Sequence, residues 1–198
     1  MDKLTMTISN SLAENKFIKP GDIDICRYGI EMFVICVLEM CSILFISAII
    51  GNFTKTIIYF VGFMPIRVYG GGYHADTRLK CFIILLTVYA AFSFVNTYEL
   101  LPKYSICAIT MMIINMFAIY LWSPLPNGNK SVNKKERQLY RKMSLLFSTI
   151  GCIITIVIIE TNFYNAYTQA FLLGLFSAFT SLIAGKIKNT LRGGEKNE

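Results

Sequence analysis

The sequence predicts an all-α, polytopic integral membrane protein, with about six transmembrane helices after an N-terminal amphipathic helix at the membrane surface. Two observations carry this prediction. Hydrophobic residues make up 55% of the chain and charged residues 16%, and the mean hydropathy is +0.54, outside the usage of soluble globular proteins. The apolar residues also form continuous segments without the alternation of a membrane β-barrel, and helices satisfy their own backbone in lipid.

Five apolar segments are predicted to cross the bilayer, where a helix needs about 20 residues. They cover residues 29–50, 81–96, 104–122, 143–159 and 166–184. A sixth, weaker segment covers residues 53–66; it is short and ends near Pro65, so we expect it to be tilted, broken or partly re-entrant. Five spans are the alternative to six. The whole chain, 1–198, is predicted to be one membrane-embedded domain.

The distribution of basic residues favours six spans. Lysine and arginine cluster in the N-terminal stretch, in the stretch before Cys81, in the loop 123–142 and in the C-terminal tail, whereas the other connections hold only Lys55 and Lys103. With six spans all four basic clusters lie on one side of the membrane, and five spans would break this pattern. The positive-inside rule makes that side, together with both termini, the cytoplasmic side of the cell membrane.

The first residues favour a surface helix over a signal peptide. Leu4, Ile8 and Leu12 recur every four residues among polar ones, and Lys-Pro-Gly-Asp at 19–22 ends the pattern. The net charge is +7, but the basic residues are juxtamembrane, so we expect contact with anionic lipid and no binding of nucleic acid.

Six cysteines without a CxxC pair favour neither disulfides nor a zinc site, so no metal and no cofactor is expected. Cys36, Cys41, Cys107 and Cys152 fall inside apolar segments and are interpreted as packing residues.

The candidate catalytic residues lie in a polar, glycine-rich stretch between two apolar segments. His74 is the sole histidine and precedes Cys81 by seven residues. Because the thiolate is the nucleophile, such a cysteine needs a base. The two residues share a helical face if the stretch is helical; otherwise a loop built on glycines folds His74 back over the thiol. Gly70, Gly71 and Gly72 allow positive φ angles, and their N–H groups are candidate oxyanion donors. From spacing alone, a packing cysteine and an interfacial histidine remain open alternatives.

Three further residues are candidates for supporting roles. Arg67 either orients a carboxylate or sets topology. Asp76 either orients His74 or is simply solvated. Glu39 falls in the middle of the first span, where it could pair with Arg67, line a substrate groove, or pack as a neutral residue.

A small-residue face lies in the last apolar segment, where Ser177, Ser181 and Gly185 repeat every four residues, as do Gly174 and Ala178. Such a face predicts close helix packing, either within one chain or in a homodimer.

Two runs of residues resemble those of one known family. The first is Arg67-x-x-x-Gly71-Gly72-Tyr73-His74-Ala75-x-Thr77-x-x-x-Cys81. The second, in the loop 123–142, comprises Ser123-Pro124, Asn129-Lys130, Glu136 and Arg141-Lys142. Both resemble the accessory gene regulator B (AgrB) family, membrane-embedded cysteine endopeptidases of Gram-positive bacteria that process a quorum-sensing propeptide. With the length, the basic inner loops and the span pattern, the resemblance covers nearly the whole chain.

The resemblance implies a mechanism and a partner. Cys81 would attack a peptide carbonyl of an AgrD-like propeptide on the cytoplasmic side, with His74 as base and then acid. The C-terminal tail would leave, and a side-chain thiol or hydroxyl of the propeptide would displace the resulting thioester to give a (thio)lactone ring.

Other function classes remain as alternatives. A small peptide transporter or exporter without proteolytic activity explains the spans but not the Cys–His pair. A metal-dependent intramembrane protease lacks an H-E-x-x-H motif. A non-catalytic membrane partner of a kinase or receptor also leaves the pair unexplained.

Overall fold

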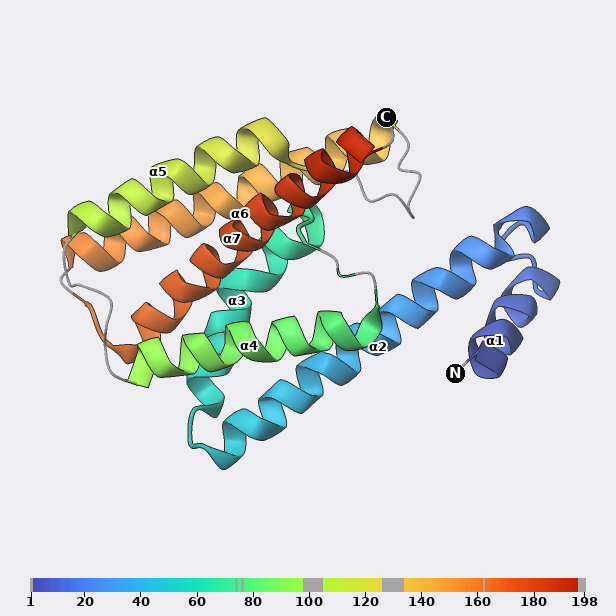
Figure 1. Ribbon diagram of the computed structural model, residues 1–198, viewed down its shortest axis with the longest axis horizontal. Helices are drawn as coiled ribbons and strands as arrows, with labels where there is room; N and C mark the ends of the chain where they lie inside the picture. Colours follow the sequence, from blue (N-terminus) through green and yellow to red (C-terminus); the bar gives the residue numbers. More distant parts are fainter. Residues whose placement is uncertain are drawn as a thin grey trace. The chain divides into compact units, whose positions relative to one another are not determined.

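The computed structural model describes residues 2–73, 75, 77–97, 105–125, 134–161 and 163–195, and their regular structure is entirely helical. The described residues form seven α-helices, α1 to α7, which are labelled in Figure 1. The all-α prediction is therefore confirmed. The chain divides into two compact units, Met1–Ile49 and Ile50–Glu198, each described by itself below. The single domain over 1–198 stays a prediction.

The N-terminal unit consists of α1 (Asp2–Glu14), a short 3-10 helix (Pro20–Asp22) and α2 (Ile23–Ile49). The predicted N-terminal helix is present, and it packs against α2, where Arg27 contacts the sulfur of Met6 at 3.6 Å. Leu4 and Ile8 of α1 are exposed, as expected of a helix that offers an apolar face to lipid. Its location at the membrane surface stays a prediction.

The second unit is built around α7 (Ala166–Glu195), which packs against the four other helices of the unit (Figure 1). These are α3 (Phe53–Gly70), α4 (Arg78–Thr97), α5 (Ser105–Trp122) and α6 (Lys134–Glu160). Four helices of the described part of the chain, α2, α4, α6 and α7, are long and apolar enough to cross a bilayer. The described part of α5 contributes a shorter apolar helix, Met112–Trp122. The count of six spans stays a prediction.

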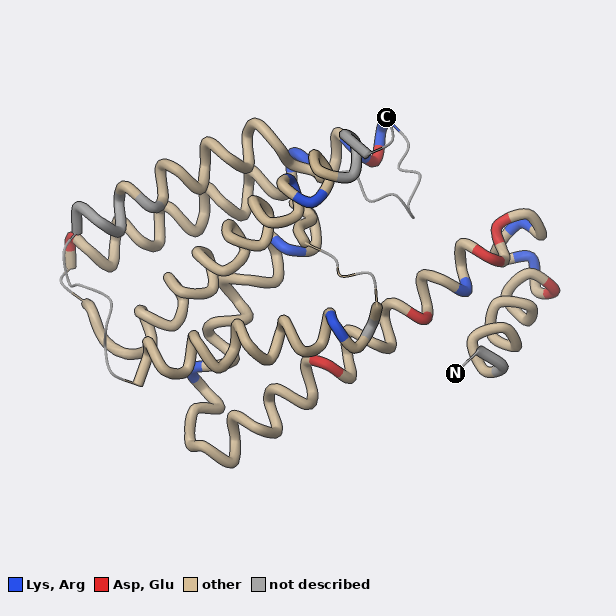
Figure 2. Tube along the Cα trace, viewed as in Figure 1, with Lys and Arg blue, Asp and Glu red and all other residues tan. Residues whose placement is uncertain are grey.

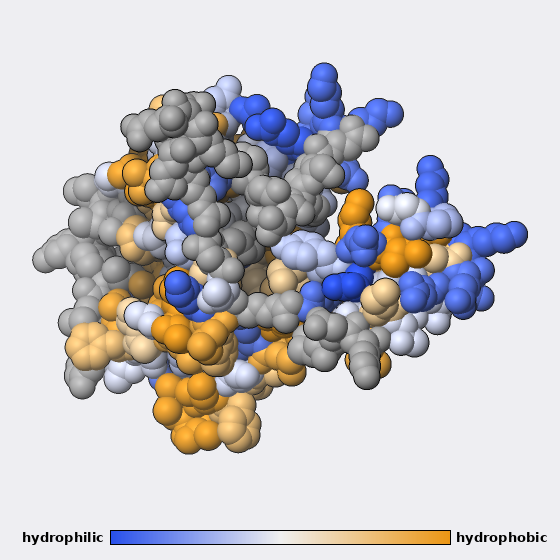
Figure 3. Space-filling model, turned by 45° about the vertical axis from the view of Figure 1, so that its right-hand side comes forward, coloured by the Kyte–Doolittle hydropathy of each residue, from blue (hydrophilic) through white to orange (hydrophobic). Residues whose placement is uncertain are grey.

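Large apolar side chains are exposed along these helices, and Figure 3 shows orange hydrophobic patches at the surface. On α5 and α6, for example, Phe117 is 64% exposed and Val157 53%. In water such patches would cost free energy, whereas lipid tails solvate them. The surface therefore suits the solvent that the composition predicts.

Close backbone contact joins α3 and α7. A Cβ atom on Gly62 would lie 2.6 Å from the carbonyl oxygen of Phe171, and one on Gly174 would lie 3.1 Å from the amide nitrogen of Phe63. Ala178 on the same side of α7 is buried. The small-residue face thus packs within the chain, which is one of the two predicted alternatives. The homodimer stays a prediction, without this face to support it.

The weak segment is a single helix with a longer extent than predicted. The predicted end of this segment at residue 66 is wrong, because α3 continues through Pro65 to Gly70. Proline removes one backbone donor, but a helix packed against neighbours tolerates that loss. Tyr59, Phe63 and Ile66 are buried, so tertiary packing supports α3 on both sides of the proline.

Basic residues gather at one end of the second unit (blue in Figure 2). The last turn of α3 holds Arg67, and the first turn of α4 holds Arg78 and Lys80. Basic residues also begin α6 and end α7. The consecutive directions of the helices bring these segments to the same end, which is the arrangement that the positive-inside rule requires. Lys55, in the first turn of α3, lies at the other end of that helix.

Candidate functional site

A glycine turn follows α3 at the basic end of the second unit. Gly71 has φ 79° and Gly72 has φ 152°, conformations that a residue with a Cβ rarely adopts. Positive φ is thus found at two of the three glycines expected to allow it, whereas Gly70 is the last residue of α3 and does not have positive φ. The oxyanion role of their N–H groups stays a prediction.

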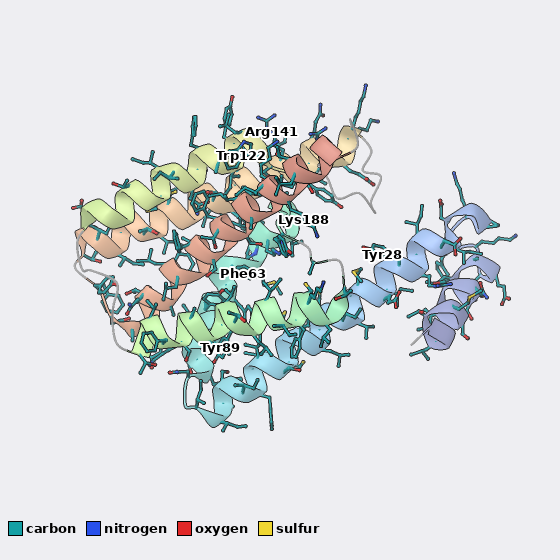
Figure 4. All side chains as sticks on the ribbon, viewed as in Figure 1. Tyr28, Phe63, Tyr89, Trp122, Arg141 and Lys188 are labelled. Carbon is teal, nitrogen blue, oxygen red and sulfur yellow. The ribbon has the colours of Figure 1, made fainter. Side chains whose placement is uncertain are left out.

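The turn is held against α7 through Tyr73. The Tyr73 amide donates to the Ser181 carbonyl at 2.8 Å and lies 3.3 Å from the Ser181 hydroxyl. The Tyr73 carbonyl accepts a hydrogen bond from the Arg67 guanidinium, so Arg67 contacts the chain just before His74. Lys188 lies over the Tyr73 ring, with its Nζ 5.0 Å from the ring centroid. Figure 4 shows Lys188 on α7 beside the end of α3.

Cys81 lies in the first turn of α4. The Thr77 hydroxyl accepts the Lys80 amide at 3.3 Å, and the Thr77 carbonyl accepts the Cys81 amide at 3.1 Å. Thr77 therefore caps the helix that carries the cysteine. The Cys81 thiol is free and half-buried. The N-terminal turn of a helix favours negative charge, which suits a site where an oxyanion develops.

The loop that begins at Ser123 and Pro124, which carries the second run of family-like residues, contacts the glycine turn. The Leu125 amide donates to the Gly70 carbonyl at 3.1 Å, and a Cβ on Gly71 would lie 3.3 Å from that of Leu125. The Ser123 and Ser144 hydroxyls are buried and 2.6 Å apart, which ties this loop to α6. Two runs about fifty residues apart in sequence therefore form one local structure.

Arg141 connects α6 to the end of α5 near this loop. It donates to the Tyr120 carbonyl at 3.0 Å and lies 5.2 Å from the Tyr120 ring centroid. Figure 4 labels Arg141 on α6, and Trp122 at the end of α5. Glu136 is in the first turn of α6, and Lys142 follows Arg141. Asn129 and Lys130 lie outside the described residues.

The remaining predicted site residues are His74, Asp76 and Glu39. His74 and Asp76 lie outside the described residues, so their pairing with Cys81 and with each other stays a prediction. The stretch is not one helix, because Gly71, Gly72, Tyr73 and Ala75 are not helical and α4 begins at Arg78. The alternative with both catalytic residues on one helical face is therefore wrong. Glu39 is half-buried in α2, in the other unit, and its pairing with Arg67 stays a prediction.

Sequence reasoning missed Ser181, Gly185 and Lys188 as contacts of this turn. The spacing of four residues between Ser181 and Gly185 predicted close packing, but no signal named the glycine turn as the partner.

Comparisons with known proteins find relatives whose matched range contains both runs. The family model for accessory gene regulator B matches residues 5–183. A putative AgrB-like protein 1 of Clostridium perfringens is 27% identical over 134 residues, which are 67% of this chain and 68% of that protein. Protein FsrB of Enterococcus faecalis is 25% identical over 61% of this chain and 50% of its own length. A putative AgrB-like protein of Listeria innocua is 21% identical over 87% of this chain and 83% of its own.

No solved structure matches the chain. The family match alone covers nearly all of the sequence, including the glycine turn, Cys81 and the loop that meets them. The chain therefore belongs to the accessory gene regulator B family, which takes part in the processing of autoinducing peptides in quorum sensing.

Proposed function

We propose that the chain is a membrane cysteine endopeptidase that removes the C-terminal tail of an AgrD-like propeptide and supports closure of the remaining peptide into a ring. The observation that carries the proposal is the placement of Cys81. Its thiol is half-buried in the first turn of α4, and only a short stretch with the sole histidine separates α4 from the anchored Tyr73. In the sequence, the proposed base therefore lies between two segments that are held in place. These are Tyr73, which is hydrogen-bonded to α7, and α4, which carries the nucleophile.

In the first step, Cys81 attacks the carbonyl carbon of the scissile bond while His74 accepts the thiol proton. The C–N bond breaks, and His74 passes its proton to the leaving amine. The C-terminal tail departs, and the rest of the propeptide stays on the Cys81 sulfur as a thioester. Backbone N–H groups at Gly71 and Gly72 are the proposed donors to the oxyanion.

In the second step, a thiol or hydroxyl of the propeptide attacks the thioester carbonyl. Its proton returns through His74 to the Cys81 sulfur, the enzyme C–S bond breaks, and a thiolactone or lactone ring closes. Water competes with this nucleophile, so the site has to exclude it. Its position at the edge of an apolar helix bundle suits that requirement.

The supporting residues have distinct proposed roles. Arg67 holds the Tyr73 carbonyl and thereby orients the chain before His74. Asp76 orients the imidazole, and Glu39 lines the path of the propeptide. The basic end of the second unit, with Cys81, faces the cytoplasm together with both termini, and the surrounding bilayer is the lipid partner.

The propeptide reaches Cys81 along the first half of α4. Among the described side chains of α4, the first buried one is Tyr89, and Leu79, Ile83 and Ile84 before it are exposed. A peptide with apolar side chains would cover these residues as it binds.

The test is to co-express the chain with its propeptide and to follow the propeptide by mass spectrometry. The variants are Cys81→Ala, His74→Ala and Cys152→Ala; the last is a matched control, because Cys152 is also free and half-buried but lies in α6. We expect the parent and the control to remove the tail and to yield a product lighter by one water than the linear cleaved peptide. Equal processing in all variants would remove the catalytic assignment and leave a transporter or a non-catalytic partner.

A further inference from the structure

The C-terminal half of α7 presents three residues on one face to the glycine turn. Ser181, Gly185 and Lys188 are spaced by four and three residues, which places them on the same side of a helix. Ser181 receives the Tyr73 amide, and Lys188 covers the Tyr73 ring. Between them, α7 has no side chain at Gly185, and the backbone of the turn occupies that space.

The contact at Gly185 leaves no room for a side chain. A Cβ there would lie 2.7 Å from the carbonyl carbon of Gly72, 2.9 Å from its oxygen and 2.8 Å from the Tyr73 nitrogen. All three are backbone atoms, so no rotamer change can relieve the clash. Gly72 is also closely surrounded, because a Cβ there would meet the Arg67 guanidinium and would lie 2.7 Å from the Ser181 hydroxyl. The two backbones are therefore fitted to each other at this point.

The segment that is fitted in this way leads directly into His74. Tyr73 is joined to His74 by one peptide bond, so the two Cα atoms are about 3.8 Å apart whatever the rest of the stretch does. A glycine turn on its own samples many backbone conformations. A general base, in contrast, has to stay within hydrogen-bond reach of its nucleophile, and a misplacement of about 1 Å can cost about 100-fold in rate. Something has to hold the turn, and α7 does so.

We propose that Ser181, Gly185 and Lys188 are positioning residues for His74. Resting on the proposed function, this inference assigns α7 the task of fixing the approach of the base to Cys81. The three residues contact the backbone and the ring that precede His74. Their loss is therefore expected to separate His74 from Cys81 while the thiol itself and its helix cap remain intact.

Two glycines of α7 offer a matched pair of variants. Gly185→Ala adds a methyl group against the glycine turn. Gly174→Ala adds the same group about three helical turns earlier, against the backbone of α3 at Tyr59 and Phe63. Both substitutions strain a close backbone contact of α7, but only the first touches the segment before His74. General destabilisation of α7 affects both variants, whereas the proposed role affects one.

The readout is the alkylation rate of Cys81 by iodoacetamide in full-length protein reconstituted in lipid nanodiscs, with the other five cysteines replaced by serine. At about pH 6.5 a thiol with an ordinary pKa of about 8.5 is only about 1% thiolate, so fast alkylation there requires a base partner. We expect His74→Ala and Gly185→Ala to slow the reaction by about tenfold or more at this pH, and to approach the parent rate near pH 9. We expect Gly174→Ala to show the same alkylation rates as the parent at both pH values.

Milder variants cover the case in which Gly185→Ala does not fold. Ser181→Ala removes the hydroxyl contact but keeps the carbonyl that receives the Tyr73 amide, and Lys188→Gln removes the cation over the ring. We expect the double variant to slow alkylation by several-fold at about pH 6.5. A slow His74→Ala with parent rates in Gly185→Ala or in the double variant would overturn the positioning role alone. A His74→Ala as fast as the parent would overturn the proposed catalytic pair, and the positioning role with it.

Discussion

The two halves of α4 differ in how they are held. In the second half, the Phe92 ring lies tilted against the Tyr59 ring with centroids 4.4 Å apart, and the Tyr89 hydroxyl lies 3.3 Å from that of Thr56. Asn52 donates to the Ser93 hydroxyl at 3.3 Å, which also ties this half to the start of α3. In the first half, which carries Cys81, no described side chain before Tyr89 is buried. One helix therefore joins a packed half to an open half.

The difference in burial suggests different roles for the two halves of α4. The packed half fixes the axis of α4 on α3 and α7 through buried aromatic rings, which contribute the most area per residue. The open half depends on that axis and on the Thr77 cap for its position, because few side chains hold it directly. Under the proposed function, the open half would leave room for a bound peptide beside the thiol, and the packed half would keep the thiol in place while the peptide enters.

The largest expected effect comes from Phe92→Ala in the packed half. Phe92 is buried, and truncation of a buried phenylalanine typically costs about 3–5 kcal/mol because it leaves a cavity. We expect a clear fall in the thermal unfolding temperature of the purified protein in detergent. Phe94→Ala is the matched control, since Phe94 lies two residues after Phe92 on α4 and is 58% exposed. Its cost should be about 1 kcal/mol or less. Equal losses in the two variants would contradict a packed half centred on Phe92.

A smaller effect is expected from Thr77→Ala at the other end of α4. Loss of a helix N-cap costs about 1 kcal/mol, and here it loosens the turn that carries Cys81. We expect propeptide cleavage to fall while the unfolding temperature changes little, because the packed half remains. Thr77→Ser keeps a hydroxyl and should restore cleavage. If the serine variant cleaves as poorly as the alanine variant, the cap does not explain the role of Thr77.

The helical class of the protein could be predicted from the sequence, but the ends of α3 and α4 could not. The apolar segments and the helical class follow from composition, because lipid allows few other solutions. The extension of α3 through Pro65 did not follow, since a local rule ends helices near proline, and packing against α7 overrides it. The boundary of α4 at Arg78 depends on the cap by Thr77, a short-range signal that the apolar pattern does not contain.

The candidate catalytic residues could be named from the sequence, whereas the contacts that hold the glycine turn could not. Cys81 and His74 stand out because a nucleophile and the sole histidine lie seven residues apart in a glycine-rich stretch. The contact of Tyr73 with Ser181 joins residues 108 positions apart, and no periodicity in either segment reports such a pairing. The same holds for Leu125 and Gly70. Long-range partners of a turn depend on how helices pack, which a single sequence does not specify.

The polar contact of the packed half gives a further, modest test. Thr56→Val keeps the shape of the side chain but removes the hydroxyl beside Tyr89. The expected cost is about 1 kcal/mol, because the buried Tyr89 hydroxyl loses a hydrogen-bond partner. Thermal unfolding measures it, and Tyr89→Phe should cost a similar amount. In the double variant neither partner remains, so its cost should be clearly less than additive if the two hydroxyls interact. Additive costs would mean that the two hydroxyls act independently.

The smallest stability effect, and the sharpest functional one, is expected at Ile84. It lies three residues after Cys81, hence on the same face of α4, and it is 40% exposed. Ile84→Ala should change stability by about 0.5 kcal/mol or less, since little packing is lost. If the open half receives the propeptide, the same variant raises the KM for cleavage by several-fold, because burial of two to three methylene-sized groups against the peptide is lost. Ile154→Ala on α6 has the same 40% exposure and should leave both quantities unchanged. An unchanged KM in Ile84→Ala would place the peptide elsewhere, and the open half of α4 would then face only lipid.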